Sequence, residues 1–575
     1  MDSPHADRHG QRYGGGCWRA ILLASNPVAA RAGSAADTRR SENYKRGAAD
    51  ISRLAFGRRK SFALVMKLLP RRLGALLVQQ GGQLGLSILF VLWGHSLPAR
   101  EPLPPRAQEM LLASLRSADA AWDAQVAPLP PSAPLGAELV LGVRGSSWYA
   151  LGLLQRDQPG DLARSLRLFR AVLAQQYDQP TMPWDGTYRR SAGEATPPLA
   201  AQMWHDYDPN WRQFIGTVLA LALIEYEDRI PAAERVAMEA SIRRAVEGEL
   251  KHGRLRPAYT NIALMQGFLL SYAGERLRRP EWVRAGEAWV EAIYTAFQPH
   301  ESFDEYNSPT YYGVDLYGLA LLRRHGVTPR LRELGATMEA ALWRDLAQFY
   351  HAGLKNMAGP YDRAYGIDLN RYASLVGVWL GLALPVELTP LPPVDQPMEH
   401  GGDFLCTPTY TILGVAMPAD ARRHFEHFQG ERQLTRPIAD GQRVATAWLG
   451  TTVMIGAEAT GLTRDLPKTK SQFHPATIHW QMPSGDVGWI VLRQAAKLDA
   501  RAEKNQLTIT ATGDAMFRIA APAAQLDKIT RDRWALPGLV VTITTDAQTY
   551  AVVRRQDYFE VTYGAATHFV LQTQP

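Results

Sequence analysis

One stretch of the sequence, residues 300–313, gathers most of the side chains that could do chemistry. It holds the carboxylate Glu305, the amide Asn307 and the adjacent phenols Tyr311 and Tyr312. Ser308 suits a helix N-cap, and the proline that follows it suits the first position of a helix. A helix N-terminus carries unsatisfied backbone N–H groups and a partial positive charge, so this stretch favours an anionic ligand. The alternative is an ordinary capped helix whose tyrosines pack beneath a loop.

Four other stretches combine aromatic and polar residues in the same way. They are residues 184–190, 204–208, 258–261 and 360–365. All five stretches fall in or beside the longer connections between expected helices, where binding and catalytic residues are commonest. Short turns are expected at one end of the helix pairs and the longer connections at the other end, which we call the long-loop rim. Because all five stretches fall on this rim, they indicate a functional site rather than five unrelated helix caps.

Residues 100–384 are expected to be almost entirely helical. Apolar periodicity predicts helices near 107–122, 145–155, 160–177, 209–228, 231–250, 257–275, 280–297, 309–325, 330–350 and 367–383. Prolines open two alternating series: spacings of 48 and 52 separate Pro209, Pro257 and Pro309, and spacings of 49 separate Pro231, Pro280 and Pro329. A helical hairpin that repeats about every 50 residues indicates stacked helix pairs, in an open or a closed arrangement.

The hydrophobic period changes to two after a proline-rich linker at residues 385–400. Residues 401–575 are expected to form an antiparallel β-sandwich domain, because short alternating runs are separated by Gly, Pro and Asp turns. The expected strands are 410–415, 443–449, 451–455, 477–481, 489–492, 507–511 and 539–543.

The first 99 residues carry the basic excess of the chain. Residues 1–65 hold 12 Lys/Arg and 5 Asp/Glu, and we interpret them as a disordered leader or as sequence upstream of a true start at Met66. Residues 66–99 have a basic start, an apolar stretch and a small-residue cleavage point, which predicts a signal peptide. An uncleaved anchor in the inner membrane is the alternative. We therefore expect a periplasmic or secreted protein.

Charge and cysteine content exclude several classes of partner and cofactor. The chain has a formal charge of +7, but residues 100–575 hold 48 basic and 51 acidic residues. A nucleic-acid partner is therefore not expected, and membrane contact is expected only through the N-terminal segment. Cys17 and Cys406 are the only cysteines, and no Cys/His cluster or HExxH motif occurs, so we expect neither a metal nor another cofactor. The sequence gives no indication of oligomeric state.

Helical hairpins followed by a sandwich form a layout that resembles the toroid-plus-sandwich polysaccharide lyases. These are the heparinase II/III-like enzymes and the chondroitin, hyaluronate and alginate lyases, and the likeness covers about residues 140–560. The segment from Ser302 to Gly313 resembles the one that bears their catalytic tyrosine. Thr260-Asn261 resembles their asparagine near an inner-helix start, Asn210-Trp211 resembles the opening of an earlier inner helix, and Asp362-Arg363 lies where an arginine-bearing loop is common.

The resemblance implies an α/α toroid, a β-sandwich, and a lyase that cleaves uronate-containing glycans by β-elimination. Tyr311 would act as base or acid, with His205 or Tyr312 as the second proton-transfer group. Asn261 and Arg363 would neutralise the uronate carboxylate, and Glu305 would orient Arg363 or a sugar hydroxyl. Positive charge from an arginine and a helix dipole would lower the pKa of the tyrosine. The chain departs from the pattern because Tyr312 replaces a histidine found after the tyrosine in several of these families.

Each candidate also has a structural alternative. Either tyrosine could simply pack, Asn261 could bridge helices, and Arg363 could pair with Asp362 at the surface. Further candidates for substrate binding are Trp184, Trp204 and Trp211 as sugar platforms or core residues, together with Asn307, Asp362 and His474, the last in a basic loop at 468–475. Two other functions stay open: an inverting glycoside hydrolase with paired carboxylates, and a non-catalytic glycan-binding envelope protein.

Overall fold

The computed structural model describes residues 102–130, 132–438, 441–467 and 472–574. The chain divides into two compact units, and residues Leu103–Pro575 lie in one of them. The predicted leader at 1–65 and the predicted signal segment at 66–99 lie outside the described residues. Among the helices that are described, none combines the length and hydrophobicity needed to cross a membrane.

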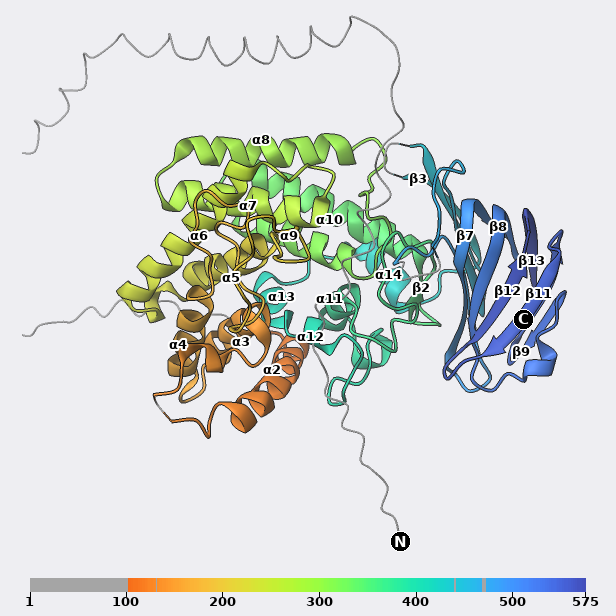
Figure 1. Cartoon of the computed structure of the whole chain (residues 1–575), viewed down its shortest axis with the longest axis horizontal. Helices are drawn as coiled ribbons and strands as arrows, with labels where there is room; N and C mark the ends of the chain where they lie inside the picture. Colours follow the sequence, from red (N-terminus) through yellow and green to blue (C-terminus); the bar gives the residue numbers. More distant parts are fainter. Residues whose placement is uncertain (1–101, 131, 439–440, 468–471, 575) are drawn as a thin grey trace, which may run out of the picture. The chain divides into compact units, whose positions relative to one another are not determined.

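The first part of the described chain is helical, as the sequence predicted. Its longer helices run in chain order (Figure 1): α2 Pro105–Gln125, α3 Gly142–Arg156, α4 Asp161–Leu173, α5 Trp211–Tyr226, α6 Ala232–His252, α7 Thr260–Arg276, α8 Pro280–Phe297, α9 Tyr311–His325 and α10 Pro329–Phe349. All three prolines of the first predicted series precede their helices: α5 and α9 begin two residues after Pro209 and Pro309, and α7 begins three residues after Pro257. The N-cap position of α9 is Thr310 and not Ser308, but the Ser308 hydroxyl still accepts a hydrogen bond of 2.9 Å from the N–H of Tyr311, the first residue of the helix.

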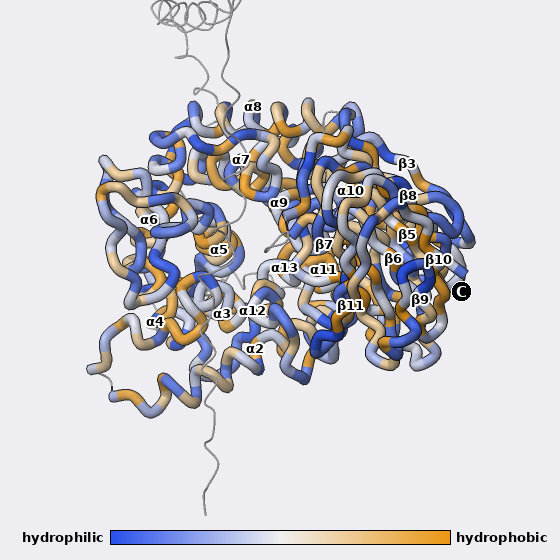
Figure 2. Tube along the Cα trace, turned by 45° about the vertical axis from the view of Figure 1, so that its right-hand side comes forward, coloured by the Kyte–Doolittle hydropathy of each residue, from blue (hydrophilic) through white to orange (hydrophobic). Residues whose placement is uncertain are grey.

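The helices pair as hairpins, with α3 against α4, α5 against α6, α7 against α8 and α9 against α10. The first helix of each pair also contacts the first helix of the next, so that α3, α5, α7 and α9 form a continuous series. A short helix, α13 (Thr407–Leu413), contacts both α9 and α3, so the series of contacts returns to its start. In Figure 2, α5 is hydrophobic over most of its length, whereas α6 and α8 carry hydrophilic stretches, as expected for inner and outer helices.

Helix α13 corrects one sequence prediction. Residues 410–415 were expected to form the first strand of the sandwich, but they lie largely within this helix. The run is buried from every side against α2, α3 and α9, and a short buried apolar run does not distinguish a strand from a helix. The predicted domain boundary at 401 is likewise early, because α12 (Gly401–Phe404) and α14 (Ala419–Glu426) precede the first strand of the large sheet. The predicted helix at 367–383 is shorter and becomes α11, Leu375–Ala383.

The C-terminal region is one antiparallel sheet of eleven strands. They are β3 Arg432–Ile438, β4 Arg443–Leu449, β5 Val453–Ala459, β6 Ala476–Gln481, β7 Val487–Glu503, β8 Gln506–Ala520, β9 Arg533–Leu536, β10 Leu539–Thr545, β11 Thr549–Arg554, β12 Phe559–Gly564 and β13 His568–Gln574. The long strands β7 and β8 pair along their length with register shifts between Leu492 and Asp499. One half of β8 pairs with β13 and the other half with β12, and the strands enclose a second hydrophobic core.

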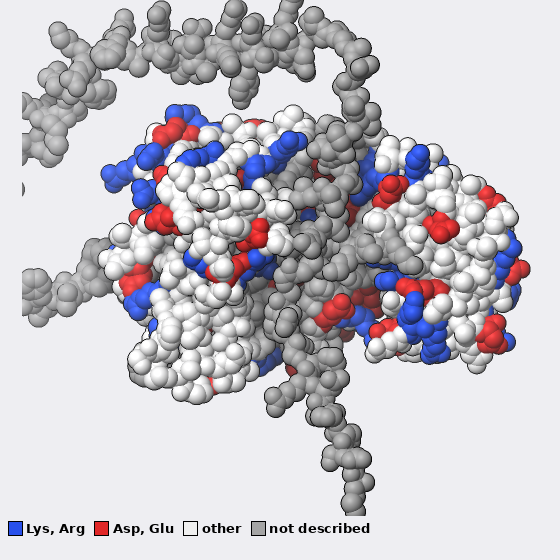
Figure 3. Space-filling model, viewed as in Figure 1, with Lys and Arg blue, Asp and Glu red and all other residues white. Residues whose placement is uncertain are grey.

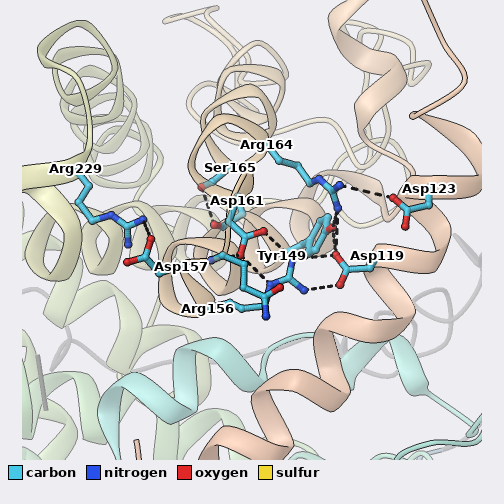
Figure 4. A network of polar contacts seen from close by, with 11 residues as sticks. Asp119, Asp123, Tyr149, Arg156, Asp157, Asp161, Arg164, Ser165 and Arg229 are labelled. Carbon is cyan, nitrogen blue, oxygen red and sulfur yellow. Dashed lines mark hydrogen bonds and ion pairs between the residues drawn. The ribbon is translucent and has the colours of Figure 1, made fainter. Parts of the chain in front are cut away.

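Charged side chains attach neighbouring elements to each other. Figure 4 shows one such group in the helical region, where Arg156 of α3 donates to Asp119 of α2 at 2.5 Å and to Asp161 of α4 at 2.7 Å. Arg164 of α4 joins the same Asp119 carboxylate and the hydroxyl of Tyr149. This network ties three consecutive helices together. Figure 3 shows acidic and basic side chains side by side over both regions, which agrees with the near-neutral balance of residues 100–575.

Candidate active site

Four of the residues predicted to do chemistry meet at the N-termini of two inner helices. Asn261 is the second residue of α7, and Tyr311 is the first residue of α9. Glu305 lies on the loop between α8 and α9, and Arg363 lies on the loop that follows the short strand β2 (Asn356–Met357). Positions 102 residues apart in sequence therefore contribute to one cluster, because the inner helices begin on the same rim.

Polar contacts link these four side chains in a row. The Asn261 amide and the Arg363 guanidinium both donate to the Glu305 carboxylate, one to each oxygen. Arg363 Nη2 donates to the Tyr311 hydroxyl at 2.5 Å, and its guanidinium carbon lies 3.7 Å from the centre of the Tyr311 ring. Glu305 and Arg363 keep only 13% and 12% of their side-chain surface exposed, so the ion pair is largely shielded from water. The surface alternative expected Arg363 to pair with Asp362, but the ion pair that Arg363 makes here is with Glu305.

Burial governs the proton affinity of the cluster. It raises the pKa of Tyr311 well above its ordinary value, and the charge of Arg363 offsets this only in part. The positive charge of Arg363 lowers the pKa of this tyrosine as expected, but burial outweighs it, so the net shift in the resting site is upward. Burial also raises the pKa of Glu305, against the lowering effects of Arg363 and Asn261. Arg363 stays charged, because Glu305 and Tyr311 raise its pKa although burial lowers it.

Three aromatic residues and the amide of Asn210, none of which was given a chemical role from the sequence, extend the cluster. The Tyr365 hydroxyl lies 2.8 Å from that of Tyr311. The ring of His400 stacks on Tyr365 at a centroid distance of 4.7 Å. On the other side, the Tyr259 hydroxyl accepts a hydrogen bond of 3.0 Å from Asn210. Tyr259 and Tyr365 occur in the polar-aromatic stretches and Asn210 opens an inner helix, but His400 lies in the segment interpreted as a linker, where no pattern marked it.

Two predicted substrate-binding residues fasten the loops of the site instead. Asn307, with a φ of 50° and no exposed surface, donates its amide to the carbonyls of Ala358 and Pro360. Asp362 is 5% exposed and accepts hydrogen bonds from Arg443 and Arg464 of the sheet region. Both side chains are buried in protein contacts, so their contribution to the site is to hold the Glu305 and Arg363 loops.

Two proposed proton-transfer residues lie outside the cluster. Tyr312 is fully buried and packs edge-on against Phe303 and Tyr306, because it follows Tyr311 by about 100° around the helix. His205 is half exposed, and its imidazole lies 2.6 Å from the Asp206 carboxylate, while Arg190 donates to its backbone carbonyl. Neither side chain reaches Arg363 or Tyr311 through a described contact.

The remaining candidates are mostly core residues. Trp184 is 2% exposed and packs against Tyr207, which corrects its prediction as a sugar platform. Trp204 and Trp211 are half-buried, and the guanidinium of Arg144 lies 5.6 Å from the Trp211 ring. His474 is buried, and burial lowers its pKa to about 3, so it does not bind substrate from a surface loop.

An open cavity of about 530 Å³ lies beside the Glu305–Arg363 pair, between the helical region and the sheet. It is lined by Asp304, Glu305, Asp362, Arg363, Gln442, Arg443, Thr460, Thr463 and Arg464. A polar cavity with both charge signs suits a hydroxyl-rich ligand that carries charge. No group of His, Cys, Asp and Glu side chains among the described residues has the arrangement of a metal site.

Comparison with known sequences assigns a family to the chain. A family model described as a domain of unknown function, DUF8769, matches residues 108–415, which is more than half of the sequence. The chain belongs to the DUF8769 family. A second model, also described as a domain of unknown function and named DUF8770, matches residues 425–571 of this DUF8769 protein. The boundary between the two matches falls just before β3, where the sheet begins. A search of curated proteins found no match.

Solved structures similar to this DUF8769 protein include two lyases. One is the chondroitin AC lyase of Streptomyces coelicolor A3, solved in complex with chondroitin sulphate, at 12% identity and a TM-score of 0.41, covering 83% of this chain and 80% of that one. Another is heparinase III, at 7% identity and a TM-score of 0.42, covering 83% and 86%. At these identities and scores the likeness carries no conclusion about activity, which is argued from the site alone.

Proposed function

We propose that this protein is a polysaccharide lyase that cleaves uronate-containing glycans by β-elimination. The observation that carries the proposal is the row of contacts Asn261–Glu305–Arg363–Tyr311 at the N-termini of α7 and α9. In the reaction the C5–H and C4–O4 bonds of the uronate break, a C4–C5 double bond forms, and the leaving oxygen takes a proton. The site needs a group that stabilises negative charge on the carboxylate, a base for C5 and an acid for O4.

Asn261 and Arg363 supply the stabilising donors in this proposal. In the resting site both donate to Glu305, so an entering uronate carboxylate competes for the same N–H groups. Burial favours the protonated form of Glu305. A Glu305 carboxyl that takes up a proton as the sugar carboxylate enters can then donate a hydrogen bond to that carboxylate, and the site avoids two adjacent buried anions.

Tyr311 acts as the acid. Its raised pKa keeps the phenol protonated at neutral pH, and Arg363 donates to its oxygen. The phenol proton therefore points toward either the hydroxyl of Tyr365 or a bound sugar. When the leaving oxygen takes this proton, Arg363 stabilises the phenolate that forms.

Tyr365 provides the second proton-transfer group. Tyr365 contacts Tyr311 through the two hydroxyl oxygens, and the ring of His400 covers Tyr365. Tyr365 replaces His205 in this role, because its hydroxyl contacts that of Tyr311, and the stacked ring of His400 holds the Tyr365 ring in place.

The architecture supports a closed toroid as part of the proposal. The contacts among α3, α5, α7, α9 and α13 return to their starting helix. In such an arrangement the N-termini of α5, α7 and α9 face a shared bowl, and Asn210, Asn261 and Tyr311 stand at those three ends. Their helix dipoles add to the positive potential that an anionic sugar meets.

Incubation of the purified protein with a panel of uronate-containing glycans tests the proposal. A lyase produces an unsaturated uronate, which absorbs in the ultraviolet, whereas a hydrolase produces reducing ends without this absorbance. We expect the absorbing product from at least one glycan and its loss in a Tyr311→Phe variant. Reducing ends alone would indicate a hydrolase, and binding without either product would indicate a glycan-binding protein.

A further inference from the structure

Two arginines of the sheet region, Arg443 and Arg464, bind Asp362 beside the candidate site. Arg443, the first residue of β4, also reaches a second loop of the site. Its Nη1 donates to both oxygens of Asp362, at 2.9 and 2.7 Å. Its Nη2 donates to the backbone carbonyl of Asp304 at 3.2 Å. Asp362 immediately precedes Arg363, and Asp304 immediately precedes Glu305. A single guanidinium thus holds the neighbours of both partners of the Glu305–Arg363 ion pair.

Burial and further hydrogen bonds hold the Arg443 guanidinium and the two loops in place. Only 16% of the Arg443 side chain and 5% of the Asp362 side chain are exposed. Fully buried Glu458 of β5 accepts a hydrogen bond from Arg443 at 3.1 Å, which fixes the guanidinium from the sheet side. The two loops are also joined to each other, because Asp362 donates its N–H to the carbonyl of Tyr306 at 3.1 Å. Loop positions held in this way from a rigid sheet have little freedom to drift.

We propose that Arg443 is a positioning residue that sets the geometry of the Glu305–Arg363 pair from the sheet. This inference rests on the proposed lyase function for its kinetic consequence, but the geometry it describes is independent of any reaction. A guanidinium is required because its planar fork reaches a carboxylate and a separate carbonyl together, which a lysine ammonium at the same position does not do. The sheet is then part of the active site although none of its strands carries a proton-transfer group.

The test compares Arg443→Gln with Arg436→Gln as a matched control. Arg436 of β3 makes an equivalent bond between the regions: its Nε lies 3.1 Å from the Asp345 carboxylate, and its Nη2 donates to the carbonyl of His300 at 3.2 Å. Arg436 contacts neither Asp304 nor Asp362. Both variants lose a partly buried ion pair between the sheet and the helices, so thermal unfolding is expected to move by a similar amount in each.

Kinetics on the responsive glycan separate positioning from stability. Arg443→Gln is expected to lower kcat by about 10- to 100-fold with KM changed less than about threefold, because a shift of about 1 Å in the reacting groups costs this much. Arg436→Gln is expected to keep kcat within about threefold, and Arg443→Lys to recover only part of the loss. Equal losses in the two glutamine variants, or an unchanged kcat in Arg443→Gln, would overturn the proposal.

Crystal structures of the two variants test the positioning role of Arg443 without any measurement of activity. In Arg443→Gln we expect the Arg363 guanidinium to leave the Glu305 carboxylate, and in Arg436→Gln we expect the pair to stay intact. If the wild-type protein gives no unsaturated product, the proposed function fails, and this comparison still supports or refutes the role of Arg443. An unmoved ion pair in Arg443→Gln refutes it.

Discussion

Replacing Tyr311 by Phe removes a single oxygen from the centre of the site. The ring and its contact with Arg363 at 3.7 Å remain, so substrate binding is expected to change little. The loss of proton transfer is expected to lower kcat by about 10² to 10⁴, which corresponds to roughly 3 to 5 kcal/mol of transition-state stabilisation. Arg363 keeps Glu305 and Gln472 as partners, and Tyr365 loses one hydrogen bond, so stability should fall by only about 1 kcal/mol.

Tyr312→Phe is the matched control, because it makes the same chemical change one residue along the same helix. Among the described residues the Tyr312 hydroxyl has no side-chain hydrogen-bond partner, and its ring faces Phe303 and Tyr306. Activity in this variant is expected to stay within about twofold of wild type. The assay is the initial rate of ultraviolet absorbance on the glycan that responds in the panel, with thermal unfolding alongside. A loss below about tenfold in Tyr311→Phe, or equal losses in the two variants, would refute the assignment.

Three further predictions follow from single contacts. Asn261→Ala removes a donor to Glu305 and should lower kcat by about 10² to 10³; activity within about tenfold of wild type would speak against the carboxylate role. Gly456→Ala would put a methyl carbon 1.9 Å from the carbonyl oxygen of Gly359, so the midpoint of thermal unfolding should drop by an amount equivalent to at least about 1–3 kcal/mol, whereas Gly402→Ala, with open space around it, should be neutral. Burial lowers the pKa of His479 to about 4, below its unfolded value of 6.5, so its contribution to stability is complete above pH 6.5 and declines as the pH falls toward 4. The unfolding free energy of wild type relative to His479→Gln, measured with denaturant, should fall by roughly 3 kcal/mol over that range, and a pH-independent difference would contradict this.

Much of the fold could be predicted from local signals. Proline spacing and apolar periodicity predict the hairpin helices. A proline near a helix start and an apolar stripe along a helix can both be recognised within a short stretch of sequence. The run at 410–415 could not be assigned in this way. Its residues are apolar on every side, and only its position against α2, α3 and α9 makes it helical. The strands β3, β9 and β11–β13 were also missed, since they are short and alternate with many polar residues.

The sequence by itself determined which residue types stand at the helix starts: the amide of Asn261, the phenol of Tyr311, and the carboxylate and guanidinium of Glu305 and Arg363. Tertiary structure decided which of them meet. Adjacent tyrosines point about 100° apart, so packing alone assigns Tyr311 to the cluster and Tyr312 to the core. It also brought in His400, from the segment interpreted as a linker, and excluded His205. The physical reason is that burial and contact distance depend on segments far apart in the chain, which no local pattern records.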